Sequence, residues 1–197
     1  NRSEAYREIS DALQSGTYDF SQPSGITSAE QVKQSSLADV ETVDKTFRAL
    51  LNMLTLSKEH REQLRSKRGL TDEQIDRFGY RSTPPFYKGR PLAERLIAKG
   101  YTVEGVPGFY QKDKHWTVNF STRTAGLLIP VRSIDRHICG FQIRLDVPLK
   151  DENDEPDKEG AKYIWLSSAG KPMGTSSGSP VHFVGDPFAR VVYVTEG

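Results

Sequence analysis

The sequence predicts an α+β fold in which a small helical subdomain is followed by a sheet-rich subdomain. Two observations lead to this class. Between residues 43 and 98 the apolar residues recur at helical spacing, in short segments bounded by capping residues. After Gly100 they occur instead in short β-branched and aromatic runs separated by turn residues. Helices followed by strands are typical of α+β proteins.

Residues 1–40 are predicted to form a polar linker or tail. They are rich in Ser, Gln, Gly and Thr, and apart from a short amphipathic helix expected over 4–13 they offer little to bury. This composition suggests a segment that joins the domain to something upstream.

Residues 41–84 are predicted to form the helical subdomain, with three short helices over 43–54, 58–68 and 72–78. Their boundaries carry explicit signals: Ser57 as an amino-terminal cap, Gly69 as a stop, Thr71 with Gln74 as a capping box, and Gly79 as a second stop. The second helix also carries a basic row, spaced three, four and three, on one face: Lys58, Arg61, Arg65 and Arg68. Such a row is typical of a solvated face, and also of a helix that crosses a phosphate backbone.

Residues 85–189 are predicted to begin with a helix that starts at Pro91 and ends at Gly100. Strands are then expected over 115–120, 126–133, 137–145, 162–167, 180–184 and 190–197.

Composition narrows the class of protein. The 197 residues are 36% hydrophobic and 27% charged, with a net charge of +1. No apolar run approaches the roughly 18 residues of a membrane span, and the polar amino end is no signal peptide. The single cysteine, Cys139, excludes an internal disulfide and fits a reducing compartment, so a cytoplasmic location without a membrane partner is expected.

The charge is unevenly distributed. The stretch 151–159 holds six acidic residues and one lysine, which is typical of a solvated loop, and the rest of the chain carries a net charge of +6. That mild excess suits a nucleic-acid binder. Metal-ligand spacing among the four histidines is absent, and Gly170-Lys171 lacks the glycine and hydroxyl offsets of a phosphate loop.

Three segments, in order, resemble bacterial-type (DnaG-like) DNA primases. "RSKRGLTDEQIDRFGYRSTP" is similar to their "RGLSEETIERFGLGYAP". "AGLLIPVRSIDRHICGFQIRLD" resembles "R-I-x-F-P-I-R-D-x-x-G-x-x-x-G-F-G-G-R", and "AKYIWLSSAGKPMG" resembles "PKYLNSPET…F-x-K-G". The resemblance covers about residues 56–197. This sequence departs from the pattern at Gly126, where the family has a basic residue, and at Trp165, where it has asparagine.

The resemblance implies that 85–189 correspond to the amino-terminal part of a primase core. It also implies that "VVYVTEG" is the first strand of a truncated Toprim domain over 190–197, with Glu196 as its catalytic, metal-binding glutamate. Toprim chemistry requires Mg²⁺ held by a later Asp-x-Asp pair as well. We therefore expect the intact parent protein, a candidate primase, to use Mg²⁺, and residues 1–197 to need no cofactor and to be inactive alone.

The resemblance further implies a basic, aromatic wall that holds a template strand, because cations neutralise phosphates and aromatic rings stack on bases. The candidate nucleic-acid-binding residues are Arg123, Arg132, Arg144, Lys162, Tyr163, Trp165 and Lys171. Single-stranded DNA is the expected partner, with RNA primer, nucleotides and a replicative helicase as further candidates, in a primase-like protein of a plasmid or other mobile element. Tyr163 and Trp165, two residues apart, equally fit one face of a packed core.

Two other functions remain open on the sequence. One is a protein-interaction or regulatory module with a degenerate Toprim domain. The other is a fragment of a Toprim nuclease.

Overall fold

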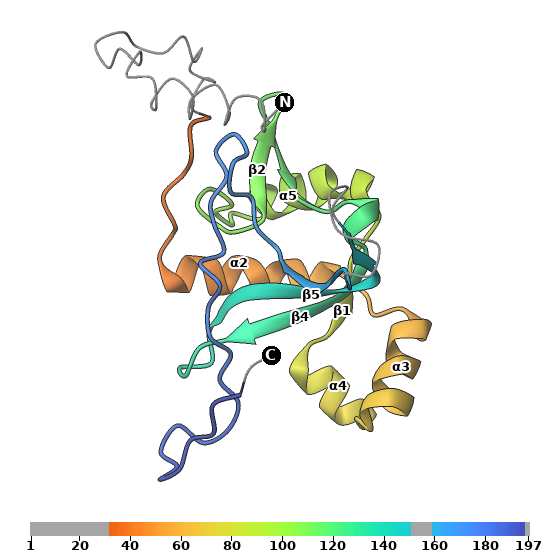
Figure 1. Cartoon of the computed structure of the whole chain (residues 1–197). Helices are drawn as coiled ribbons and strands as arrows, with labels where there is room; N and C mark the ends of the chain where they lie inside the picture. Colours follow the sequence, from red (N-terminus) through yellow and green to blue (C-terminus); the bar gives the residue numbers. More distant parts are fainter. Residues whose placement is uncertain (1–31, 151–158, 196–197) are drawn as a thin grey trace, which may run out of the picture. The chain divides into compact units, whose positions relative to one another are not determined.

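The computed structural model describes residues 32–150 and 159–195, and it confirms the α+β class (Figure 1). The helix expected over 4–13, most of the acidic stretch and Glu196 lie outside the described residues. The helices are α2 (Val40–Met53), α3 (Lys58–Arg68), α4 (Asp72–Phe78) and α5 (Gly89–Ala98), with 3-10 turns η1 (Phe86–Lys88) and η2 (Thr122–Thr124).

A four-stranded sheet forms the centre of the fold. Its strands are β1 (Arg81–Ser82), β4 (Gly126–Arg132), β5 (Ile138–Leu149) and β6 (Ala161–Trp165), in the order β1-β4-β5-β6. Every neighbouring pair is antiparallel. A separate hairpin pairs β2 (Phe109–Lys112) with β3 (His115–Val118).

The two faces of the sheet have different partners, as Figure 1 shows. On one face the cross-strand row Leu128, Ile143 and Ile164 joins the main core, to which α2 and α5 contribute. Phe47 of α2 packs on Phe141 of β5 with ring centres 4.5 Å apart. α2 therefore contributes to the main core.

The opposite face carries α3 and α4. Leu64 and Ile75 from these helices are buried against Leu127 of β4 in a second, smaller apolar cluster. The predicted boundaries of both helices are confirmed. Ser57 accepts from the His60 N–H, the capping box forms, and Gly69 and Gly79 adopt left-handed conformations at φ 64° and 77°.

Hydrogen bonds of the buried His60 fix α3 to the sheet, and we call this group of contacts the polar joint. His60 Nδ1 lies 2.7 Å from Ser82 Oγ in β1, and its Nε2 lies 2.7 Å from Asp146 Oδ1 in β5. The Ser57 N–H donates to the same Ser82 hydroxyl at 2.8 Å. Because buried polar groups are costly unless paired, this joint determines how α3 sits on the sheet.

Several predicted elements differ from the structure. Helix α5 begins at Gly89, two residues before Pro91, because the 3-10 turn leads into it. Strand β2 was missed. Its two-residue turn, Asp113-Lys114, has φ of 51° and 64° and so follows the tight-hairpin geometry without the glycine that usually signals it.

The strands predicted over 180–184 and 190–197 do not form within the described residues. Residues 180–184 lie beside the end of β4, where the Phe183 N–H donates to the Arg132 carbonyl at 2.9 Å, but no ladder follows. Val191–Val194 are 62–93% exposed and pair with no described strand. A β-branched run becomes a buried strand only where a neighbour takes its backbone hydrogen bonds, and the described part of the chain supplies none.

Candidate nucleic-acid interface

The sheet face that carries α3 and α4 leaves part of β5 and β6 open. Arg144 pairs with Tyr163 across the two strands, and Gln142 pairs with Trp165. Directly opposed residues of an antiparallel pair point to the same face, so these four side chains share one surface. In the neighbouring strand, Leu127 lies opposite Arg144 and is the residue that α3 covers. The helices thus stop where this polar and aromatic surface begins.

The aromatic pair on this surface is unequally buried. Tyr163 is 43% exposed, whereas Trp165 is half-buried. A side chain added at Gly140 would meet the Trp165 ring at 3.2 Å and Pro180 at 3.0 Å, so the ring lies over the glycine and beside the proline. Trp165 therefore both packs and presents part of its ring, and Tyr163 is the more exposed of the two.

A small hollow of about 190 Å³ lies between α3 and β5, lined on the α3 side by Gln63, Leu64, Lys67 and Arg68 and on the sheet side by Leu127 and Arg144. Among the described residues, the Arg144 side chain makes only a long hydrogen bond to Gln63 Oε1, at 3.5 Å. Within the described residues, none of the three cations in this hollow forms an ion pair. Arg144, Lys67 and Arg68 thus have no neutralising carboxylate in the described part of the chain.

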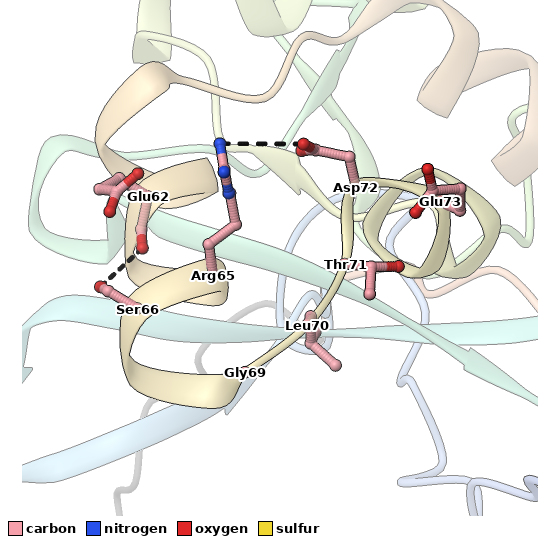
Figure 2. A pocket seen from close by; sticks show the side chains of 8 residues that line it. All are labelled: Glu62, Arg65, Ser66, Gly69, Leu70, Thr71, Asp72 and Glu73. Carbon is pink, nitrogen blue, oxygen red and sulfur yellow. Dashed lines mark hydrogen bonds and ion pairs between the residues drawn. The ribbon is translucent and has the colours of Figure 1, made fainter.

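The four residues of the basic row predicted on α3 differ in their contacts, because two of them form ion pairs with α4. Arg61 donates to Asp72 and to Asp76 of α4, at 2.7 Å each, and these hydrogen bonds raise its pKa and lower that of Asp72. Figure 2 shows Arg65 directed at Asp72 as well, across 3.8 Å. These two arginines hold α4 in place, which leaves Lys58 and Arg68 of the row for other partners.

The hollow between α3 and α4 in Figure 2 is a poor site for a nucleic acid. Its volume is about 530 Å³, and it is lined by Glu62, Asp72 and Glu73 with Arg65 as the one cation. The net negative charge of this lining repels phosphate.

The other predicted residues are scattered. Lys162 alternates with Tyr163 along β6 and so points to the opposite face, where it pairs with Glu159 at 2.6 Å. Lys171 lies over the ring of Tyr110, at 4.8 Å from its centre. Arg123 is exposed on η2. Arg132 lies at the far end of β4 in a second cleft, whose lining includes Ile129, the cross-strand partner of Gln142. From Leu127 to Arg132 is five residues, or about 17 Å along a strand.

The structure thus brings together Arg144, Tyr163 and Trp165 of the predicted set, and adds Gln142, Lys67 and Arg68 beside them. Arg68 was part of the predicted row on α3. Lys67 was missed, since it falls outside the three-four-three spacing, and its only signal was its place in the last helical turn, where cations favour the helix dipole.

No group of three or more His, Cys, Asp or Glu side chains that could hold a metal ion occurs among residues 32–150 and 159–195. The glutamate assigned to that role, Glu196, lies outside this part of the chain. None of the helices that the structure describes is long and apolar enough to cross a membrane.

No protein-family model and no curated protein matches the chain. Solved primase structures are similar to it. For the RNA polymerase domain of Mycobacterium tuberculosis DnaG, in complex with a double-stranded DNA oligomer with a 6-nucleotide overhang, the identity is 18% and the TM-score 0.46, over 67% of this chain and 40% of that one. For the zinc-binding and RNA polymerase domains of Aquifex aeolicus primase, the identity is 16% and the TM-score 0.43, over 66% of this chain and 30% of that one. For the Escherichia coli primase catalytic core, the identity is 23% and the TM-score 0.33, over 64% of this chain and 37% of that one.

These structures are cores of the family whose motifs the sequence resembles. The chain spans about two fifths of the length of the Mycobacterium tuberculosis chain it matches. Because all three TM-scores lie below 0.5, the likeness by itself establishes no shared function.

Proposed function

We propose that this chain is the single-stranded nucleic-acid-binding part of a primase-like replication protein. The observation that carries the proposal is the open β5–β6 surface, where Arg144, Tyr163 and Trp165 lie together beside Lys67 and Arg68 of α3. Cations along a groove with exposed aromatic rings are the features that bind single strands without sequence preference.

The chemistry of the surface favours a single strand over a duplex. Tyr163 and Trp165 offer ring faces to unpaired bases, which a duplex keeps stacked inside. Arg144, Lys67 and Arg68 supply the phosphate contacts from one side of these rings. We propose DNA as the strand, with RNA primer, nucleotides and a helicase as partners of the parent protein, in a plasmid or other mobile element.

Catalysis belongs to the same proposal. In a Toprim site a glutamate and an Asp-x-Asp pair share the Mg²⁺ ions, and residues 1–197 contain Glu196 but no Asp-x-Asp sequence. We expect residues 1–197 to bind a strand and to make no primer. Primer synthesis by this chain on a single-stranded template with Mg²⁺ would contradict that expectation.

The binding test compares the effects of removing Arg144 of β5 and Lys162 of β6, two cations on neighbouring strands. Arg144→Ala should weaken binding of a labelled single-stranded oligonucleotide by roughly 10- to 150-fold, since charged hydrogen bonds contribute roughly 1.5–3 kcal/mol. Lys162→Ala, on the opposite face and paired with Glu159, should change it less than twofold. Equal losses for the two variants would show that net charge, and not this surface, drives binding.

The interaction-module alternative predicts a different result. A protein-docking surface would use the same aromatic residues, but its partner has no phosphate backbone. Its binding would therefore lack the steep salt dependence of phosphate contacts. Oligonucleotide binding that is absent at low salt would favour that alternative.

A further inference from the structure

Among the four side chains of β5 and β6 that share the open surface, that of Gln142 is the one amide. Its cross-strand partner on β6 is Trp165. The Leu166 N–H donates to the Phe141 carbonyl at 2.9 Å, which makes these two residues a hydrogen-bonded pair. The next pair, Gln142 and Trp165, is therefore a non-hydrogen-bonded one, in which opposed side chains lie closest. The Gln142 amide and the Trp165 ring are thus immediate neighbours.

The amide lies between an aromatic ring and a cation. Along β5 the residues on this face are Gly140, Gln142 and Arg144, because side chains alternate between the two faces of a strand. A side chain added at Gly140 would meet the Trp165 ring at 3.2 Å, so the ring extends toward Gly140. Arg144 follows on the other side of the amide, about 7 Å along the strand. A nucleotide with its base on the ring and its phosphate at Arg144 therefore passes over the amide.

The Gln142 amide has no hydrogen-bond partner in the described part of the chain. The residue is partly exposed, so water meets the amide in the free protein. A ligand replaces that water without loss when it offers both a donor and an acceptor, since the amide carries one acceptor oxygen and two N–H donors. The primase pattern that this segment resembles has glycine at this position, so the amide is a feature of this chain and not of the pattern.

The base that an amide selects follows from the groups on each base edge. On the Watson–Crick edge every base offers a donor next to an acceptor, so an amide does not discriminate there. On the Hoogsteen edge only adenine pairs a donor, N6–H, with an acceptor, N7. Guanine presents two acceptors on that edge, cytosine a donor alone and thymine an acceptor alone. In a single strand this edge is open to a side chain, and adenine is the base that fits both groups of the amide.

We propose that Gln142 gives the β5–β6 surface a preference for adenine, an inference that rests on the proposed single-strand binding. The Gln142 carbonyl accepts from N6–H of the base and its N–H donates to N7. The cations and the rings of the surface accept any nucleotide, because phosphates and ring faces are common to all four. The amide therefore sets which base occupies this position, while Arg144 and the aromatic residues supply the affinity.

The test is fluorescence anisotropy of the full chain with labelled single-stranded DNA of one length. The strands are oligo-dC and the same strand with its central nucleotides replaced by dA, dG, dT or 7-deaza-dA. The adenine strand should bind at least about fivefold more tightly than oligo-dC, since a bidentate base contact discriminates by a factor of roughly 5 to 150. The 7-deaza-dA strand, which lacks N7, should bind like oligo-dC.

Three variants assign the preference to the amide. Gln142→Ala should bind the adenine strand and oligo-dC equally, with the affinity for oligo-dC unchanged. Gln142→Met keeps the length of the side chain and should do the same, which separates the loss of the amide from a loss of packing. The matched control is Gln111→Ala on the separate hairpin, where a partly exposed glutamine also lies opposite a tryptophan, Trp116. This control should keep the full preference for adenine.

The outcomes separate this inference from the proposed function. Equal binding of the adenine strand and oligo-dC by the unmodified protein would overturn the preference and leave strand binding standing, as would a preference for another base. A preference that persists in Gln142→Ala, or for 7-deaza-dA, would assign it to stacking on the rings and overturn the role of the amide. Binding of none of the strands would overturn the proposed function, and this inference with it.

Discussion

Replacing each of the two aromatic residues of the β5–β6 surface with alanine should lower the stability of the protein by different amounts. Trp165 is half-buried over Gly140, and Tyr163 is 43% exposed on the same face. Truncating a fully buried large aromatic residue costs about 3–5 kcal/mol of stability, so Trp165→Ala should cost about 2 kcal/mol. That corresponds to a fall of about 4–8 °C in the thermal midpoint for a chain of this size. Tyr163→Ala should cost less than about 1 kcal/mol.

Binding should respond differently from stability. If both rings stack on bases, each variant loses about 1–3 kcal/mol of affinity for a single strand, or roughly 5- to 150-fold. Denaturant unfolding and fluorescence anisotropy on the same preparations give the two quantities, and Tyr87→Ala, an exposed tyrosine on η1, is the matched control. Retained affinity in both variants, with stability lost only for Trp165, would refute the stacking argument and assign the ring to packing alone.

Two other predictions concern stability. His60→Ala removes the joint between α3, β1 and β5 and should lower the free energy of unfolding by about 2–3 kcal/mol; a change below about 0.5 kcal/mol in urea unfolding would contradict the joint. Burial lowers the pKa of His182, whose Nδ1 already accepts the Arg132 N–H, so the unfolded chain binds more protons between that lowered pKa and 6.5. The free energy of unfolding should therefore fall as pH drops below 6.5, and His182→Gln should remove the part of this pH dependence that His182 causes. Parallel curves of unfolding free energy against pH for the two proteins would show that His182 contributes nothing to the pH dependence.

Local signals predicted the helical elements well. The boundaries of α3 and α4 followed from Ser57, Gly69, the Thr71–Gln74 box and Gly79, because caps satisfy backbone groups within a few residues of themselves. The strands over 180–184 and 190–197 were predicted from the same kind of local pattern and do not form within the described residues. A strand depends on a partner elsewhere in the chain, which composition does not reveal.

The site was predictable only in part. Arg144 meets Tyr163 through a register that no local pattern contains. The alternation of side chains along β6 was available, however, and it already separates Lys162 from Tyr163 and Trp165. The cleft that holds Arg132 was out of reach, since two of the residues that line it, Arg48 and Arg136, lie 88 residues apart and meet only after folding.

The salt dependence of single-strand binding tests the central claim most directly. The logarithm of the binding constant should fall linearly with the logarithm of salt concentration, and Arg68→Ala/Arg144→Ala should reduce that slope by about 1.4, or roughly 0.7 for each lost phosphate contact. The control, Arg95→Ala/Lys99→Ala on the exposed end of α5, removes the same charge and should leave the slope of the unmodified protein unchanged. A slope that is the same in both double variants would contradict the assignment of the β5–β6 surface as the nucleic-acid interface.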